Sequence, residues 1–166
     1  YWGNTTLTLG GIKAGSATAF SSNSLYSLAN AASASLQLNN FDVSIGNLAG
    51  GGTAGGSVAL GAKKLTIASG NSTQTYAGII SGTDASSLVK LGTAVLTLSG
   101  NNTFTGTVTV GALNGANVGG LTISGNTAIK GATVNAGTLT ITHATAATNM
   151  TIGGAVNVTG GAFTMA

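Results

Sequence analysis

Apolar and hydroxyl side chains alternate one by one in short runs along the whole chain. The longest such region runs from Leu88 to Val110, where Leu-Thr-Leu and Val-Thr-Val flank a cluster of Ser, Gly and Asn. Alternation with a period of two residues is typical of a half-buried β-strand, with apolar side chains inward and threonine outward. The same alternation recurs at Leu7–Leu9, Leu36–Leu38, Val43–Ile45, Val58–Leu60, Leu65–Ile67, Leu96–Leu98, Val108–Val110, Leu121–Ile123, Leu139–Ile141, Met150–Ile152, Val156–Val158 and Phe163–Met165. The pattern predicts an all-β protein built from many short strands.

The spacing of these runs is loose but regular enough to suggest a repeat. Leu7, Leu36, Leu65 and Leu96 begin similar triplets 29 to 31 positions apart, and later triplets follow more closely. The Gly-, Asn- and Ser-rich segments between them supply turn residues that tolerate left-handed backbone angles. This arrangement favours a β-solenoid with coils of about 20–25 residues, stacked at the strand spacing of about 4.8 Å. We expect roughly seven coils and a rod about 35 Å long, as a single domain over residues 1–166.

The composition fits an ordered chain with an uncharged polar surface. Hydrophobic residues make up 43% of the 166 residues and charged residues only 4%, against about 25% charged in an ordinary soluble domain. Hydroxyl and amide side chains must therefore supply the polarity, and without cysteine the chain has neither disulfides nor thiolate metal ligands. The best helical candidate is the Ala-rich, Gly-free segment 25–38. It is either a short helical turn or a loop that crosses outside the strands.

The charged side chains are thinly spread along the sequence. The net charge of +3 comes from Lys13, Lys63, Lys64, Lys90 and Lys130 against two aspartates, and there is no arginine. Nucleic-acid binding favours clustered Lys and Arg with stacking aromatics, so we interpret the lysines as scattered solubilising charges and predict no nucleic-acid partner. No segment approaches the ~20 apolar residues of a membrane-spanning helix, so we predict no integral membrane segment in this chain.

The segment from Leu88 to Val110 resembles the passenger-associated repeat of bacterial autotransporters. The repeat reads approximately L-x-K-x-G-x-G-x-L-T-L-S-G-x-N-T-Y-T-G-x-T-x-V. The matching residues are Leu88, Lys90, Gly92, Leu96, Thr97, Leu98, Ser99, Gly100, Asn102, Thr103, Phe104, Thr105, Gly106 and Val110, while Ala94 replaces the second glycine. The best match covers residues 58–110, because the preceding 58–82 also resembles the segment that leads into the repeat. The resemblance implies a right-handed parallel β-helix exported to the outer cell surface of a bacterium.

Residues suited to catalysis are scarce. An acid–base glycosidase needs two neighbouring carboxylates, but the two acids, Asp42 and Asp84, lie in or beside predicted turns, where aspartate typically caps the backbone. His143 is the single histidine and cannot alone form a metal site or a triad. The segment Gly50–Gly55 matches G-x-G-x-x-G, but the residues after it predict a strand where a phosphate-binding helix would be required. We therefore predict a protein that is not an enzyme and holds neither metal nor cofactor.

Two threonine-rich runs, 103–109 and 138–142, place several hydroxyls on one strand face. Flat threonine arrays bind ice in some small β-solenoids, but they require many coils in register, and the spacing along this chain is irregular. An ice-binding solenoid and a polysaccharide-active enzyme are therefore remote alternatives.

Both ends of the chain resemble ordinary coils, without a proline, a lysine-rich segment or a helix as a cap. Unpaired strand edges at the ends of a solenoid are normally capped, and a head-to-tail contact between copies propagates into a filament. We predict end-to-end assembly into a surface fibre, with Tyr1, Trp2, Phe163 and Met165 at the junction. The alternative is a monomeric passenger stalk or adhesin segment. The partners would be further copies of the chain, or cell-surface and matrix components of a host or a neighbouring cell.

Overall fold

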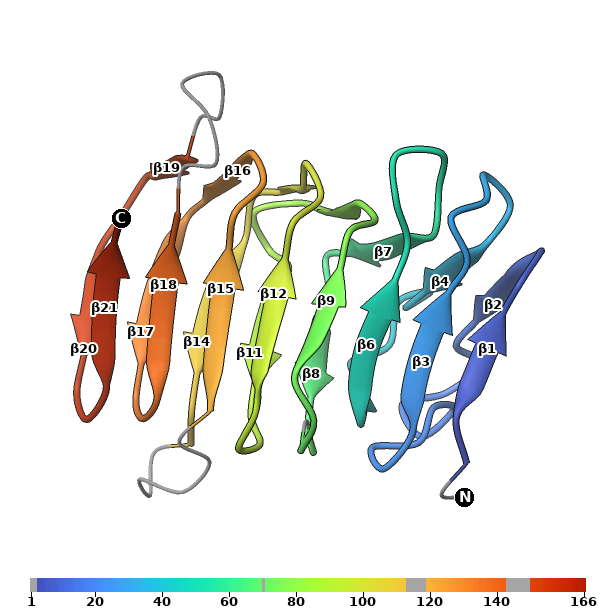
Figure 1. The fold of residues 1–166 in the computed structure, drawn as a ribbon, viewed down its shortest axis with the longest axis horizontal. Helices are drawn as coiled ribbons and strands as arrows, with labels where there is room; N and C mark the ends of the chain where they lie inside the picture. Colours follow the sequence, from blue (N-terminus) through green and yellow to red (C-terminus); the bar gives the residue numbers. More distant parts are fainter. Residues whose placement is uncertain (1–2, 70, 113–118, 143–149) are drawn as a thin grey trace.

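The chain forms a β-solenoid of about seven turns in a computed structural model, which describes residues 3–69, 71–112, 119–142 and 150–166. Figure 1 shows the strands side by side, in sequence order along the rod. The strand pairs recorded within the sheets are all parallel, and the described residues contain no helix. The coil is right-handed, because the chain ascends in the near sheet of Figure 1 and descends behind it while advancing from right to left. The predicted all-β solenoid is confirmed.

Each complete coil contributes one strand to each of three faces. Sheet A contains β1 (Thr5–Leu7), β3 (Leu25–Leu28), β6 (Asn47–Gly50), β9 (Gln74–Tyr76), β12 (Val95–Leu98), β15 (Gly120–Ile123), β18 (Thr138–Ile141) and β21 (Ala162–Met165). Sheet B contains β2 (Gly11–Lys13), β4 (Ser35–Gln37), β7 (Ser57–Gly61), β10 (Ile80–Gly82) and β13 (Thr103–Phe104), and the pair β16 (Thr127–Ile129) and β19 (Met150–Ile152) follows it. Sheet C contains β5 (Val43–Ile45), β8 (Lys64–Ile67), β11 (Ser87–Lys90), β14 (Thr107–Val110), β17 (Gly131–Val134) and β20 (Val156–Val158).

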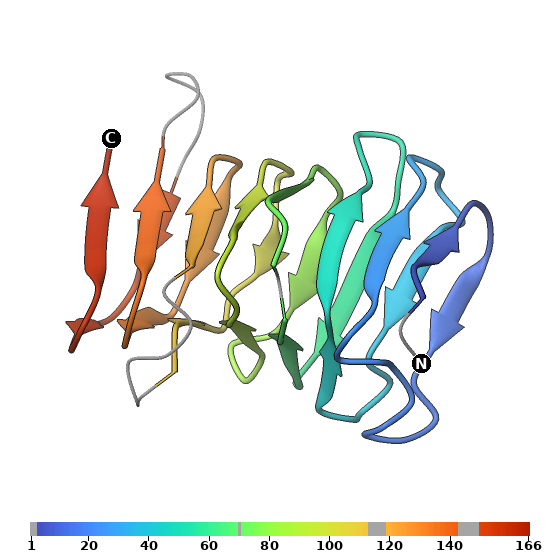
Figure 2. The same cartoon turned by 60° about the horizontal axis from the view of Figure 1, so that its bottom comes forward.

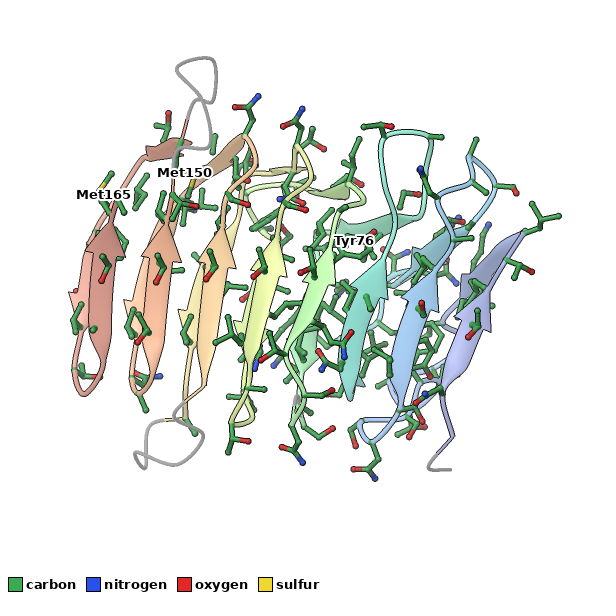
Figure 3. The ribbon with its side chains drawn as sticks, in the orientation of Figure 1. Tyr76, Met150 and Met165 are labelled. Atoms are coloured by element: carbon green, nitrogen blue, oxygen red, sulfur yellow. The ribbon has the colours of Figure 1, made fainter. Side chains whose placement is uncertain are left out.

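The alternation in the sequence sorts side chains between the core and the surface. In sheet A, Leu96, Leu121 and Leu139 occupy consecutive positions of one inward ladder, and each is 0% exposed. One residue further along each strand, threonines form an outward ladder across five coils. Its members are Thr75, Thr97, Thr122, Thr140 and Thr164. Figure 3 draws the side chains along the strands.

The threonine ladder lies in register although the coils differ in length. The first residues of successive sheet A strands are 18 positions apart between Gly120 and Thr138, but 27 apart between Asn47 and Gln74. Loops at the corners absorb the difference, and Figure 2 shows them along the margins of the rod. The expectation that irregular spacing would put the hydroxyls out of register is therefore wrong.

The spacing of 29 to 31 residues between leucine triplets does not correspond to one coil. Leu7 lies in sheet A, Leu36 in sheet B and Leu65 in sheet C, before Leu96 returns to sheet A. Each interval is thus one coil plus one further face. The candidate helical segment 25–38 is also corrected, since it forms β3, a turn and β4. Tyr26 and Leu28 face the core in β3, and Leu36 faces it in β4.

Corners where the chain leaves sheet C use glycine in the left-handed region. Gly92 has a φ of 82° and Gly111 a φ of 78°, values that residues with a Cβ rarely adopt. At the earlier exit from sheet B, Asn39 and Asn40 have φ values of 49° and 69°, which asparagine tolerates better than most residues. The turn chemistry predicted for Gly and Asn is therefore confirmed at these corners.

Candidate functional site

The predicted assembly residues are only partly within the described chain. Tyr1 and Trp2 lie outside the described residues, whereas Phe163 and Met165 lie on β21 and point along the inward ladders. Met165, labelled in Figure 3, is 59% exposed, although Ile141 at the same ladder position one coil earlier is 0% exposed. The face of β21 away from β18 therefore presents apolar side chains that another coil would cover.

Charged side chains gather on one edge of the solenoid. We call it the B–C edge, where the chain passes from the sheet B side to sheet C. Six of the seven charged residues lie there: Lys13, Asp42, Lys63, Lys64, Asp84 and Lys130. Residues up to 117 positions apart in the sequence (13 to 130) thus lie along one edge of the solenoid. Sheet A carries no charged side chain on any of its eight strands.

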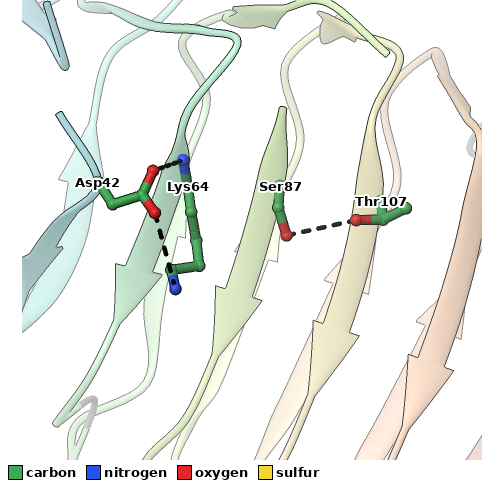
Figure 4. A network of polar contacts seen from close by, with 4 residues as sticks. All are labelled: Asp42, Lys64, Ser87 and Thr107. Atoms are coloured by element: carbon green, nitrogen blue, oxygen red, sulfur yellow. Dashed lines mark hydrogen bonds and ion pairs between the residues drawn. The ribbon is translucent and has the colours of Figure 1, made fainter. Parts of the chain in front are cut away.

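Polar contacts connect neighbouring coils along the B–C edge. The Lys64 backbone N–H donates to Asp42 Oδ1 at 2.9 Å, and the Lys64 ammonium lies 3.9 Å from Asp42 Oδ2. On the next two coils, the hydroxyls of Ser87 and Thr107 are hydrogen-bonded at 3.3 Å. Figure 4 shows the four side chains in a row across the strands. The Asp42–Lys64 contact is the only ion pair among the described residues.

An open cavity of about 350 Å³ lies further along the same edge. It contains one acid and one base from different coils, together with hydroxyl groups and apolar side chains. Its lining residues are Asp84, Thr105, Ala128, Ile129, Lys130, Thr151 and Gly153. The Thr105 hydroxyl is 3.2 Å from Asp84 Oδ1 and donates to it. In the cavity, the Asp84 carboxylate is therefore hydrogen-bonded to Thr105. The Lys130 ammonium forms no ion pair within the described part of the chain.

The two aspartates do not form a catalytic pair. Asp42 contacts Lys64 and Asp84 contacts Thr105, and the strands that follow them, β5 and β11, are separated by β8. Two strand spacings correspond to about 10 Å. No group of three or more His, Cys, Asp or Glu able to hold a metal ion occurs in the described ranges, and His143 lies outside them. None of the described residues belongs to a helix long and apolar enough to span a membrane.

Lys90 is the one charged residue away from the edge. It occupies an inward ladder of sheet C between Ile67 and Val110 and is 2% exposed. Its ammonium donates to the Leu91 carbonyl, and burial lowers the pKa of Lys90 below its usual range. Tyr76 is similarly buried, and its hydroxyl donates to the Gly56 carbonyl, while burial raises the pKa of this phenol. Both groups contact backbone inside the coil and are not presented to a ligand.

Sequence reasoning identified each charged residue but not their common edge. The available signal was position within the repeat, since Asp42, Lys63 and Asp84 each lie between a sheet B strand and a sheet C strand. Recognising it requires the length of each coil, and the unequal loops conceal that length.

A comparison with known proteins gives a relative for this solenoid. Over 112 residues, 66% of its length, the chain is 45% identical to a protein named "Adhesin BmaC autotransporter" from Brucella suis biovar 1 (strain 1330). The predicted resemblance to autotransporter passengers is confirmed. The parallel β-solenoid is the fold that this resemblance implied for the passenger repeat.

The match covers a small part of the adhesin. The chain spans about 3% of the length of this curated relative. No protein-family model and no solved structure matches the chain.

Proposed function

We propose that this chain is a non-catalytic structural segment of an autotransporter passenger, displayed outside a bacterial cell and contributing to adhesion. The observation that carries the proposal is the 45% identity to an autotransporter adhesin, in a chain that folds as a parallel solenoid. A solenoid offers long surfaces whose side chains vary while the core repeats. The partners would be components of host or neighbouring-cell surfaces, or of the matrix between them.

Adhesion can be tested with beads that carry the purified chain. We expect them to attach to an epithelial monolayer more strongly than beads carrying an inert protein. A Leu121→Asp variant places a carboxylate at a 0% exposed position of the core. It should unfold the chain and thereby abolish attachment. Thr122→Asp adds the same charge on the outward side of the same strand and is the matched control. Attachment no stronger than that of inert beads would contradict the proposal.

End-to-end assembly into a fibre is a second candidate. The observation in its favour is the exposure of apolar ladder positions on the last described coil, where Met165 is 59% and Val158 48% exposed. A further coil supplied by a second copy would bury these side chains and pair the open backbone of β21.

Negative-stain electron microscopy over a concentration series tests this assembly. Unbranched filaments with an axial repeat of about one rod length, about 35 Å, would support it. Met165→Lys should then shorten the filaments, while Thr164→Lys, on the outward side of β21, should affect them less. Discrete particles at every concentration would eliminate assembly and leave the monomeric adhesin segment.

A further inference from the structure

The cavity on the B–C edge offers three kinds of contact within about 350 Å³. The Asp84 carboxylate only accepts hydrogen bonds, and the Thr105 hydroxyl, which donates to Asp84, can accept one from a ligand. The Thr151 hydroxyl can both donate and accept. The Lys130 ammonium donates hydrogen bonds and carries a positive charge. Most of the accessible surface of the cavity is apolar, and the exposed methyl group of Ala128 contributes to it.

These contacts match the groups on an acidic sugar. A sugar ring presents neighbouring hydroxyls that can donate to a carboxylate and a C–H face that can pack against a methyl group. A uronic acid or a sulfated sugar adds an anion that an ammonium group attracts. The cavity is shallow and wide open to solvent, and its volume of about 350 Å³ leaves room for one or two sugar units.

We propose that this cavity binds an acidic sugar unit of a cell-surface or matrix glycan, with Lys130 contacting the anionic group and Asp84 accepting from the sugar hydroxyls. The proposal rests on the adhesive function proposed above and specifies the class of its ligand.

The rest of the B–C edge favours a polymer over a free sugar. Lys63 lies just before β8, and Lys130 just before β17, with β11 and β14 between these two strands. Three strand spacings amount to about 14 Å, so a linear polyanion leaving the cavity along the edge would pass the ammonium of Lys63. Lys13 lies further in the same direction, at the end of β2. A neutral polysaccharide gains nothing from these charges.

A nucleic acid fits the edge less well than an acidic glycan. The chain contains no arginine, and none of the described residues that line the cavity has an aromatic ring. Stacking on aromatic side chains and arginine contacts are the usual means of binding single strands. Because Asp84 lies in the cavity, a polymer of phosphates without accessible hydroxyls would meet repulsion there without compensation.

The test measures binding of the full 166-residue chain to immobilised hyaluronan, to bacterial alginate and to neutral dextran by biolayer interferometry. We expect binding to at least one acidic polymer, weakened by added salt, and none to dextran. Preference for hyaluronan or for alginate supports the proposal in either case and distinguishes an animal matrix from a bacterial exopolysaccharide as the source. Absence of binding to both acidic polymers overturns it.

Three variants separate a specific cavity from general attraction. Lys130→Ala should raise Kd by at least about tenfold, as expected for a lost hydrogen bond between charged groups. Lys13→Ala removes the same charge from the same edge, far from the cavity, and should raise Kd by no more than about threefold. Asp84→Asn makes the chain more positive, yet should raise Kd by about fivefold because the carboxylate accepts from the sugar.

The sign of the Asp84→Asn effect is decisive. If attraction by net charge were the whole interaction, this variant would bind acidic polymers more tightly, and Lys130→Ala and Lys13→Ala would lose affinity equally. Either result overturns the proposed site. These side chains are exposed, so the variants should keep the unfolding midpoint of the parent chain. Bead attachment without glycan binding would leave the adhesive function standing and remove only this assignment of its ligand.

Discussion

Sheet A and the B–C edge belong to the same coils but differ in regularity and in charge. Sheet A runs unbroken through eight strands, with leucine ladders inside, threonine ladders outside and no charged side chain. Along the B–C edge, sheet B ends after five strands and its register shifts between Ser81 and Gly82. Six charged residues lie there, in the turns or at the strand ends beside them.

The difference shows where a solenoid can vary. Each sheet A strand is hydrogen-bonded to neighbours on both sides, apart from the two outermost, so a misplaced side chain disturbs two ladders. A corner residue meets water and has fewer fixed neighbours. Variation in charge therefore accumulates at the edge, where it suits recognition, while the sheets maintain the stack.

The largest effect should come from breaking the inner ladder of sheet A. Leu121→Ala removes a 0% exposed side chain between Leu96 and Leu139 and should lower the free energy of unfolding by about 2–5 kcal/mol. Urea denaturation followed by circular dichroism measures it. Thr122→Ser on the outward ladder is the control and should change stability by less than about 0.5 kcal/mol. If both variants lost the same stability, packing of the inner leucine ladder would not be the main source of the stability of sheet A.

Removing the Tyr76 hydroxyl tests the connection between sheet A and the glycine-rich loop before β7. Tyr76→Phe leaves the buried Gly56 carbonyl without this donor and should destabilise the fold by about 1–3 kcal/mol. Burial raises the pKa of Tyr76, so above about pH 10, where an unfolded phenol ionises, the parent chain should lose stability as pH rises.

The Tyr76→Phe variant lacks this titration and should therefore show a shallower decline in alkaline urea titrations. Parallel curves for the two proteins would contradict the assignment.

Replacing Lys90 tests how the one charged residue that lies inside the coil affects stability. Lys90→Ile restores an aliphatic residue between Ile67 and Val110 and should raise the free energy of unfolding by about 1–2 kcal/mol at pH 7. Because burial lowers the pKa of Lys90, the free-energy cost of burying its charged ammonium in the folded parent is fully present below that lowered pKa. It is relieved as pH rises toward the unfolded value of about 10.4.

The difference between parent and Lys90→Ile should accordingly shrink between pH 7 and pH 10. Lys130→Ile, on the exposed edge, serves as the control and should change stability by less than about 0.5 kcal/mol. A variant less stable than the parent at pH 7 would show that the bond to Leu91 outweighs the burial of charge.

The smallest effect should come from the ion pair on the B–C edge. Asp42→Asn removes a contact between side chains that are about half exposed, at 54% and 50%, and should destabilise the chain by at most about 1 kcal/mol. The loss should disappear in 1 M salt, where the Debye length is about 3 Å. A larger loss that persists in high salt would indicate that the Asp42 bond to the Lys64 backbone N–H carries the effect.

The sequence predicted the strands better than it predicted their neighbours. Alternation at Leu96–Leu98 and Leu121–Ile123 identified strands and their buried sides, because the period of two is a property of the extended backbone. It was wrong at Leu9, which lies beyond β1 and is 75% exposed. There the alternation continues past the point where the neighbouring strand stops pairing.

The candidate site was less accessible to prediction than the fold. Asp84 and Lys130 are 46 positions apart (84 to 130), and they line one cavity only because the intervening coils have particular lengths. Local sequence places Asp84 in or beside a turn, which is correct, but it gives Lys130 only as an isolated charge. Whether the two side chains come together depends on the number of residues in each intervening loop, and no local sequence pattern gives that number.

From the sequence alone come the β-strands whose residues alternate, their inward and outward sides, the glycine corners and the resemblance to an autotransporter passenger. These depend on backbone geometry and on residues close together along the chain. Only the tertiary structure decides which triplets stack, that threonines align in register despite coils of unequal length, and that six charges share one edge. Pairing between strands fixes the register of each coil on the next, and the loops vary in length to allow it. This stacking then decides which side chains on different coils lie side by side.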